Sequence, residues 1–255
     1  MKFDIKQDKD YKYIDEGHGE TLLLLHGLFG ALSNYQFILN DFKDKYRVVI
    51  PILPIYELGL LESTVGGLVK YVRRFVDHMQ LNHMIIVGNS LGGHIAQLYC
   101  LDQPQKVKAM VLTGSSGLFE RSFGGTFPKR GDYEYIKQRT EYTFYDPKTA
   151  TKELVDEVFD IVNDKGKAIR VISTAKSAMR ENLAERLYQV TCPVLLIWGK
   201  EDNITPSFVA EEFHKLIKNS ELVWMEQCGH APMMEKPEEF NRLMANFLNK
   251  ICVSV

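Results

Sequence analysis

The sequence has no long hydrophobic run and no excess of either charge. None of its 255 residues belongs to a stretch approaching about 18 apolar residues, so a membrane-spanning helix is not expected. The N-terminus is rich in lysine and aspartate and lacks the apolar segment of a secretory signal. Lysine and arginine (31) nearly balance aspartate and glutamate (33), which indicates neither nucleic acid nor an anionic membrane as a partner. We therefore expect a cytoplasmic protein with neither nucleic acid nor a membrane as a partner, and the oligomeric state stays open.

Cysteine is also scarce. The four cysteines are widely spaced and show no Cys-x-x-Cys pair, and they are Cys100, Cys192, Cys228 and Cys252. This pattern favours reduced core or surface thiols over disulfides or metal ligands, so no metal site is predicted. The remaining composition, with 45% hydrophobic and 25% charged residues, is typical of a globular chain that can bury a sizeable core.

The chain is organised around the stretch from residue 83 to residue 93. Its apolar, β-branched run Ile85–Val87 predicts a short buried strand, which ends at a Gly-x-Ser-x-Gly box formed by Gly88, Ser90 and Gly92. The two glycines allow a close approach of strand and helix backbones, and the serine is expected in a strained conformation that exposes its Oγ. A helix over Leu91–Asp102 would then point its N-terminal amides at the same place.

Strands and helices alternate on both sides of this stretch. That alternation predicts an α/β fold with a parallel sheet covered on both faces. Apolar spacing predicts helices over Leu60–Leu81, over Leu91–Asp102, from Pro237 onward, and after Thr205 as N-cap with Pro206 in the first helical position. The predicted strands are Phe3–Ile5, Tyr11–Asp15, Thr21–Leu25, Tyr46–Ile50, Ile85–Val87, Val107–Thr113, Pro193–Gly199 and Glu221–Met225.

Residues 117–188 have a different character, because they are helical and rich in aromatics. About 70 residues exceed what one crossover between two strands needs, although two more sheet-covering helices are the simpler alternative. We predict a helical lid inserted into a core made of residues 1–116 and 189–255. The aromatic residues of its first part are Phe119, Phe123, Phe127, Tyr133, Tyr135, Tyr142, Phe144 and Tyr145.

Three predicted loops at the carboxyl ends of strands carry Ser90, Asp202 and His230. Ligands of open parallel sheets bind at that edge. A serine hydroxyl needs a base such as imidazole, and the imidazole needs a carboxylate to fix its tautomer. Serine, acid and histidine also follow in the chain order expected for a Gly-x-Ser-x-Gly elbow. The neighbouring Glu201 is the alternative acid, but Asp202 stands nearer the predicted helix start.

The loop His26-Gly27-Leu28-Phe29-Gly30 follows another buried strand. Acyl transfer passes through a tetrahedral oxyanion, and loss of one backbone donor to it costs on the order of 3 kcal/mol. The amide of Leu91 is one predicted donor, and that of Leu28, or alternatively Phe29, is the second. His26 is expected to tie this loop down and not to act as a second base.

Four boxes together resemble the α/β-hydrolase superfamily. They are Gly88-Asn89-Ser90-Leu91-Gly92-Gly93, His26-Gly27-Leu28-Phe29-Gly30, Trp198-Gly199-Lys200-Glu201-Asp202, and Gly229-His230-Ala231-Pro232 with Glu235-Lys236-Pro237. The resemblance implies an eight-stranded, mostly parallel sheet, a helical cap, and hydrolysis through an acyl-serine without a cofactor. We also predict substrate contacts from Phe29 and Trp198. One departure is the apolar loop Pro51–Gly59, where relatives commonly carry an Asp-Pro-Gly turn.

The serine at the elbow favours hydrolysis of a carboxylic ester or thioester. The aromatic residues of the predicted lid indicate a small-molecule substrate that is largely apolar. A second hypothesis is carbon–carbon bond hydrolysis of a diketone-like ring-cleavage product, which similar proteins catalyse with the same three residues. That reaction requires a cation for the substrate carboxylate, and the candidates are Arg130, Arg139, Arg170 and Arg180. A third hypothesis is a ligand-binding module in which lid motion signals to a partner.

Overall fold

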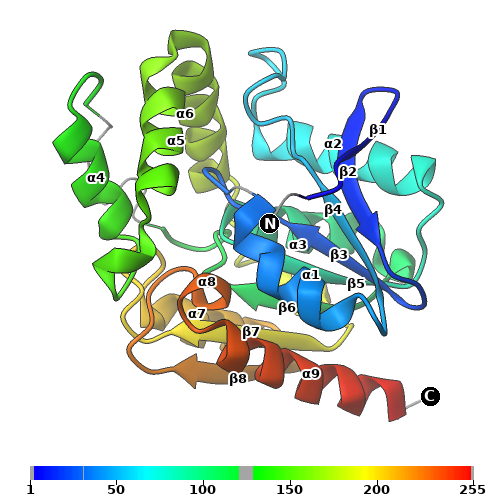
Figure 1. Cartoon of the computed structure of the whole chain (residues 1–255). Helices are drawn as coiled ribbons and strands as arrows, with labels where there is room; N and C mark the ends of the chain where they lie inside the picture. Colours follow the sequence, from blue (N-terminus) through cyan, green and yellow to red (C-terminus); the bar gives the residue numbers. More distant parts are fainter. Residues whose placement is uncertain (1–2, 31, 121–128, 254–255) are drawn as a thin grey trace.

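A computed structural model describes residues 3–30, 32–120 and 129–253 of the chain. One eight-stranded sheet runs in the order β1-β2-β4-β3-β5-β6-β7-β8. Strands β1 and β2 pair antiparallel, as do β2 and β4, and every other pairing is parallel. The expected α/β fold is confirmed (Figure 1). The strands are β1 (Lys6–Asp8), β2 (Tyr11–Glu16), β3 (Thr21–Leu25), β4 (Arg47–Pro51), β5 (Met84–Asn89), β6 (Val107–Thr113), β7 (Val194–Gly199) and β8 (Ser220–Met225).

The first strand is Lys6–Asp8 and not Phe3–Ile5, as the sequence had suggested. Lys9 has a positive φ of 52° and forms the turn together with Asp10, so Asp8 pairs with Tyr11. The turn therefore sets the register, and it places the strand three residues later than its apolar residues indicate.

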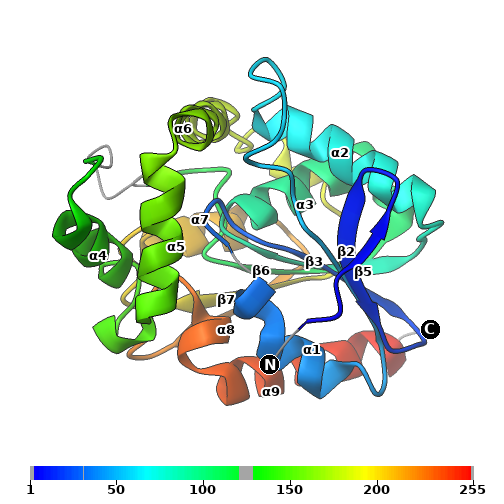
Figure 2. The same ribbon diagram turned by 45° about the horizontal axis from the view of Figure 1, so that its top comes forward.

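Side chains alternate between the two faces of the sheet and build two apolar layers. Leu22 and Leu24 of β3 point into one layer, whereas Leu23 and Leu25 point into the other, and all four are fully buried. Burial of one such leucine contributes about 1.5–3 kcal/mol. Helices α2 (Val65–His78), α3 (Leu91–Asp102) and α7 (Ser207–Leu216) cover one face, and α1 (Gln36–Phe42), α8 (Pro232–Glu235) and α9 (Pro237–Val253) cover the other (Figure 2).

Two predicted helix starts are corrected. Helix α2 begins at Val65 and not at Leu60, because the Thr64 hydroxyl caps it by accepting from the Gly67 N–H at 3.0 Å. Helix α7 begins at Ser207, with Pro206 at the N-cap position and no side-chain cap, because the Thr205 hydroxyl bonds elsewhere. Within the described residues, no helix is both long enough and apolar enough to cross a bilayer.

Between β6 and β7, the described residues form the α-helices α4 (Tyr133–Glu141), α5 (Lys152–Asn163) and α6 (Lys165–Arg180). The side chains of Asp132, Thr151 and Asp164 cap their N-termini. The helices lie beyond the carboxyl ends of β6 and β7, to the left in Figure 1. Phe123 and Phe127, counted among the aromatic residues of this region, lie outside the described residues.

The fold brings together two cysteines that the sequence separates by 92 positions. The Sγ atoms of Cys100, on α3, and Cys192, just before β7, lie 3.7 Å apart, and both are thiols. Sequence spacing gave no hint of this pair, because packing of α3 against the sheet creates it.

Candidate active site

Ser90 stands at a strained turn between β5 and α3. Its backbone has φ 53° and ψ −120°, a combination that non-glycine residues rarely adopt. Two backbone hydrogen bonds hold this conformation: the Ser90 N–H donates to the Thr113 carbonyl at 3.1 Å, and the Ser116 N–H donates to the Ser90 carbonyl at 3.2 Å. The loop after β6 thus fixes the elbow from one side.

The glycines around Ser90 are required by close backbone packing. A Cβ on Gly92 would lie 1.8 Å from the Leu25 carbonyl oxygen, and a Cβ on Gly88 would lie 2.6 Å from the Gly93 Cα. Neither position has room for any side chain. The elbow therefore packs directly on the end of β3, which leads into the loop from His26 to Gly30.

Asp202 and His230 form a buried pair. His230 Nδ1 lies 2.9 Å from Asp202 Oδ2, and the two residues are only 6% and 4% exposed. Burial by itself lowers the pKa of His230. The charge of Asp202 and its hydrogen bond raise this pKa, and together with the other nearby carboxylates they outweigh burial, so the pKa lies above the ordinary value of 6.5. A carboxylate at Nδ1 holds the imidazole in the tautomer whose Nε2 can accept a proton.

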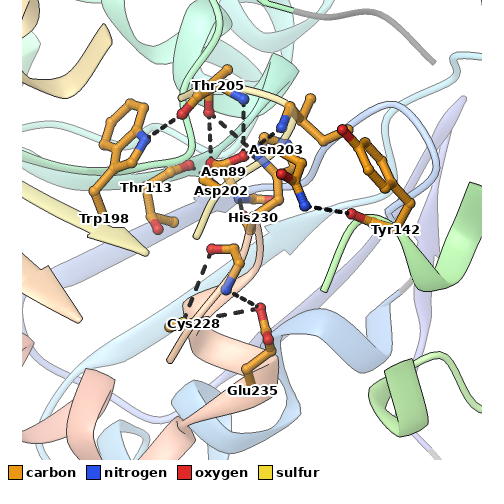
Figure 3. A network of polar contacts seen from close by, with 12 residues as sticks. Asn89, Thr113, Tyr142, Trp198, Asp202, Asn203, Thr205, Cys228, His230 and Glu235 are labelled. Carbon is orange, nitrogen blue, oxygen red and sulfur yellow. Dashed lines mark hydrogen bonds and ion pairs between the residues drawn. The ribbon is translucent and has the colours of Figure 1, made fainter. Parts of the chain in front are cut away.

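Asp202 receives three further hydrogen bonds, which Figure 3 shows in part. Its Oδ1 accepts from the N–H groups of Ile204 (2.8 Å) and Thr205 (2.9 Å), and its Oδ2 accepts from the Thr205 hydroxyl (2.7 Å). The alternative acid, Glu201, instead accepts from the Cys228 N–H at 3.0 Å. Sequence reasoning missed the role of Thr205, because its position before a proline equally suggests a helix cap.

Asn89 is a second residue that sequence reasoning missed. Its amide donates to the carbonyls of Thr113 (3.0 Å) and His230 (3.1 Å), and so joins the end of β5 to the loop that carries His230. The sequence did hold a signal for this role, because Asn89 lies directly before Ser90 inside the Gly-x-Ser-x-Gly box.

The histidine loop is also bound to the inserted region. The His230 N–H donates to the Thr143 carbonyl at 2.9 Å. The Glu235 carboxylate accepts from the N–H groups of Gly229 (2.8 Å) and Tyr145 (2.7 Å). The chain after α4 and the loop of His230 therefore share one hydrogen-bond network.

A cavity of about 190 Å³ contains both Ser90 and His230 in its wall. Residues from the inserted helices, among them Ile136, Val158 and Ala175, add apolar side chains to this wall. Among the described residues no hydrogen bond joins Ser90 Oγ to His230, although both side chains border the same space. The cavity thus places a hydroxyl and a buried imidazole–carboxylate pair next to an apolar volume.

The loop from His26 to Gly30 reaches this cavity through Leu28 and Phe29. The Gly30 N–H closes a turn onto the Gly27 carbonyl at 3.0 Å. His26 is buried and ties the loop down, since Nδ1 lies 2.9 Å from the Gly27 carbonyl and Nε2 accepts from the Leu53 N–H at 3.0 Å. Burial lowers the pKa of His26, so the ring stays neutral. Leu91, at the start of α3, also borders the cavity.

Trp198 is placed differently from the prediction. It is fully buried at the end of β7, donates its Nε1–H to the Thr205 carbonyl at 2.8 Å and packs on Phe213. It is not part of the cavity wall, because side chains alternate along β7 and this one points into the layer under α7. Phe29 does border the cavity. His94, one turn after Ser90, is buried outside the wall, where burial lowers its pKa to about 4.

Of the four candidate arginines, Arg139 alone borders the cavity. Its guanidinium lies 4.8 Å from the centre of the Tyr142 ring. Arg170 instead donates to the Leu58 carbonyl at 2.7 Å, and Arg130 to the Asn163 carbonyl at 2.7 Å.

The model of the alpha/beta hydrolase fold family matches residues 20–141 and 133–237. This chain belongs to the alpha/beta hydrolase family. It is 26% identical to a 2-hydroxy-6-oxo-6-phenylhexa-2,4-dienoate hydrolase of Comamonas testosteroni, over 93% of this chain and 91% of the relative. It is also 26% identical to the monoacylglycerol lipase ABHD6 of Bos taurus, over 92% of this chain and 77% of the relative.

A solved structure is similar over nearly the full length. The alpha/beta hydrolase MGS-MChE2, from a metagenome of lagoon sediments at Mar Chica, Morocco, is 39% identical with a TM-score of 0.80, covering 96% of this chain and 98% of the other. The fold and the membership in a family of hydrolases therefore stand on both sequence and structure.

Proposed function

We propose that this protein is a serine hydrolase that cleaves a carboxylic ester or thioester of a small, largely apolar substrate through an acyl-Ser90 intermediate. The observation that carries the proposal is that His230, paired with the buried Asp202, borders the same apolar cavity as the strained Ser90. The lipase among the relatives is in line with ester cleavage. In this proposal residues 117–188 act as a lid over a core of residues 1–116 and 189–255.

The reaction follows from the roles of these groups. His230 Nε2 takes the proton of the Ser90 hydroxyl while Oγ attacks the substrate carbonyl, and Asp202 stabilises the imidazolium that forms. The N–H groups of Leu91 and of Leu28 or Phe29 hold the oxyanion. The imidazolium then protonates the leaving alcohol or thiol. Water, deprotonated by His230, then attacks the acyl-enzyme. The imidazolium returns this proton to Ser90 Oγ as the ester bond to the enzyme breaks, which releases the acid and restores the hydroxyl. No step requires a cofactor.

The proposal is tested by labelling and turnover. A fluorophosphonate probe should label the protein once, at Ser90, and Ser90→Ala should abolish both the label and hydrolysis of p-nitrophenyl esters. Ser116→Ala is the matched control, because Ser116 also borders the cavity but has no elbow geometry, and this variant should keep the label. Ester turnover retained in Ser90→Ala would contradict the proposal.

Carbon–carbon bond hydrolysis is a second candidate, because Arg139 borders the cavity and could hold a substrate carboxylate. The Comamonas relative carries the name of such a hydrolase. Turnover of a vinylogous 1,5-diketone acid should be compared with that of neutral esters, in the wild type and in Arg139→Gln. If Arg139→Gln raises KM for the diketone acid but not for neutral esters, the result supports this candidate. If the wild type does not turn over the acid, the candidate is excluded.

A further inference from the structure

The loop after β4, which departs from the common family pattern, supports the loop from His26 to Gly30. The Leu53 N–H donates to His26 Nε2 at 3.0 Å, and the Tyr56 hydroxyl donates to the Leu28 carbonyl at 2.9 Å. Residues 53–56 thus hold both the first residue of the loop and its central peptide.

The bond from Tyr56 bears directly on the oxyanion amides. A trans peptide is planar, so its C=O and the N–H of the next residue point in opposite directions. The Leu28 carbonyl therefore fixes the direction of the Phe29 N–H. The preceding plane is held through the Gly27 carbonyl, which the Gly30 N–H contacts at 3.0 Å. With both planes held, the backbone angles of Leu28 are fixed, and so are the two candidate amides.

Tyr56 is itself held in place from the side of the inserted helices. Arg170 of α6 donates to the Leu58 carbonyl at 2.7 Å, and the Lys167 ammonium lies 6.0 Å from the centre of the Tyr56 ring. The Val65 N–H donates to the Ser177 hydroxyl, also on α6, at 3.2 Å. The segment that carries Tyr56 is therefore packed between α6 and the loop from His26 to Gly30.

We propose that Tyr56 is a positioning residue for the oxyanion hole, which acts by orienting the Leu28–Phe29 peptide through its hydroxyl. The inference rests on the proposed acyl transfer at Ser90. Tyr56 does not touch the reacting atoms. Burial, followed by the charges of Glu157 and Glu57, raises the pKa of Tyr56, so the hydroxyl stays a neutral donor at physiological pH.

The test is Tyr56→Phe, which removes one hydroxyl and leaves the ring. Loss of an oxyanion donor lowers kcat about 10²–10³-fold, and a donor that is only less well oriented should cost about 10–100-fold in kcat, with KM within about twofold. Affinity for a trifluoromethyl ketone, which forms a tetrahedral oxyanion adduct with the serine, should fall by a similar factor. A merely structural role would not produce this parallel loss.

Tyr71→Phe is the matched control. Tyr71 donates to the Ile52 carbonyl of the same segment at 3.4 Å, so this variant also removes a hydroxyl but does not affect the Leu28 peptide. It should keep the wild-type kcat. The thermal unfolding midpoints of both variants show how much stability each lost hydroxyl costs.

The outcomes separate the two proposals. Suppose that the wild type turns over esters. If Tyr56→Phe then keeps kcat within twofold, or if Tyr71→Phe lowers kcat as much as Tyr56→Phe does, the inference about Tyr56 is overturned and the proposed function stands. If the wild type neither turns over esters nor is labelled at Ser90, the proposed function falls and the inference falls with it.

Discussion

Gly199 and Gly229 lie in direct backbone contact. A Cβ on Gly199 would stand 2.1 Å from the Gly229 carbonyl oxygen and 2.3 Å from that of Cys228. Gly199 ends β7 three residues before Asp202, and Gly229 directly precedes His230. The distance between the acid and the histidine is therefore set by two loops that touch without any side chain between them.

Gly199→Ala should separate these loops. A methyl group forced against two carbonyls typically costs about 1–3 kcal/mol of stability, and the displaced pair should lower kcat by at least tenfold. Chemical denaturation and ester turnover measure the two effects. Gly66→Ala is the control, since its Cβ would meet nothing closer than 4.0 Å inside α2, and it should stabilise the protein by up to about 1 kcal/mol. If the two variants have the same stability and the same kcat, the result would count against close packing at Gly199.

The raised pKa of His230 predicts the pH dependence of the reaction. In the proposed reaction the imidazole must be neutral to accept the serine proton, so kcat/KM should fall as the pH decreases, with a midpoint above 6.5. In Asp202→Asn the charge that raises the pKa most is gone, while the burial that lowers it and the weaker effects of Glu120 and Glu235 remain. The midpoint should then shift to a lower pH than in the wild type, and the plateau should fall by on the order of 10⁴. A pH–rate profile whose midpoint does not move would show that another group controls it.

The cavity predicts a limit on acyl chain length. Ala175 of α6 borders it, so Ala175→Phe should fill part of the volume and shift the preference toward shorter p-nitrophenyl esters. Ala168→Phe changes the same helix but borders a separate small pocket, and should leave the profile unchanged. The measurement is kcat/KM along a graded series of esters. If the wild type and both variants show the same dependence of kcat/KM on chain length, the acyl group does not bind beside Ala175.

Sequence patterns predicted the features that depend on neighbouring residues. Strand β3 and helix α3 have the predicted bounds, and so does the start of α9 at Pro237, because apolar periodicity and the elbow box are local signals. The eight-stranded, mostly parallel sheet follows from the family resemblance, whereas the order of its strands comes from the structure alone.

Features that depend on distant contacts were not predictable. Asn89 and His230 are 141 positions apart, and nothing local indicates that a side-chain amide joins them. Trp198 was expected at the substrate, but the orientation of a side chain at a strand end depends on which layer its face meets. Helix α1 was missed altogether, because it has only seven residues and a short apolar pattern.

The hydrogen bonds of His230 to Thr143 and of Glu235 to Tyr145 restrict how this protein can be recombined with its relatives. A chimera that exchanges the inserted helices at the strand ends would change the backbone path of residues 143–145, whose carbonyl and N–H groups make these two supports of the loop that carries His230. Crossover points placed after residue 145 keep these supports, so libraries built on that junction should retain far more active clones.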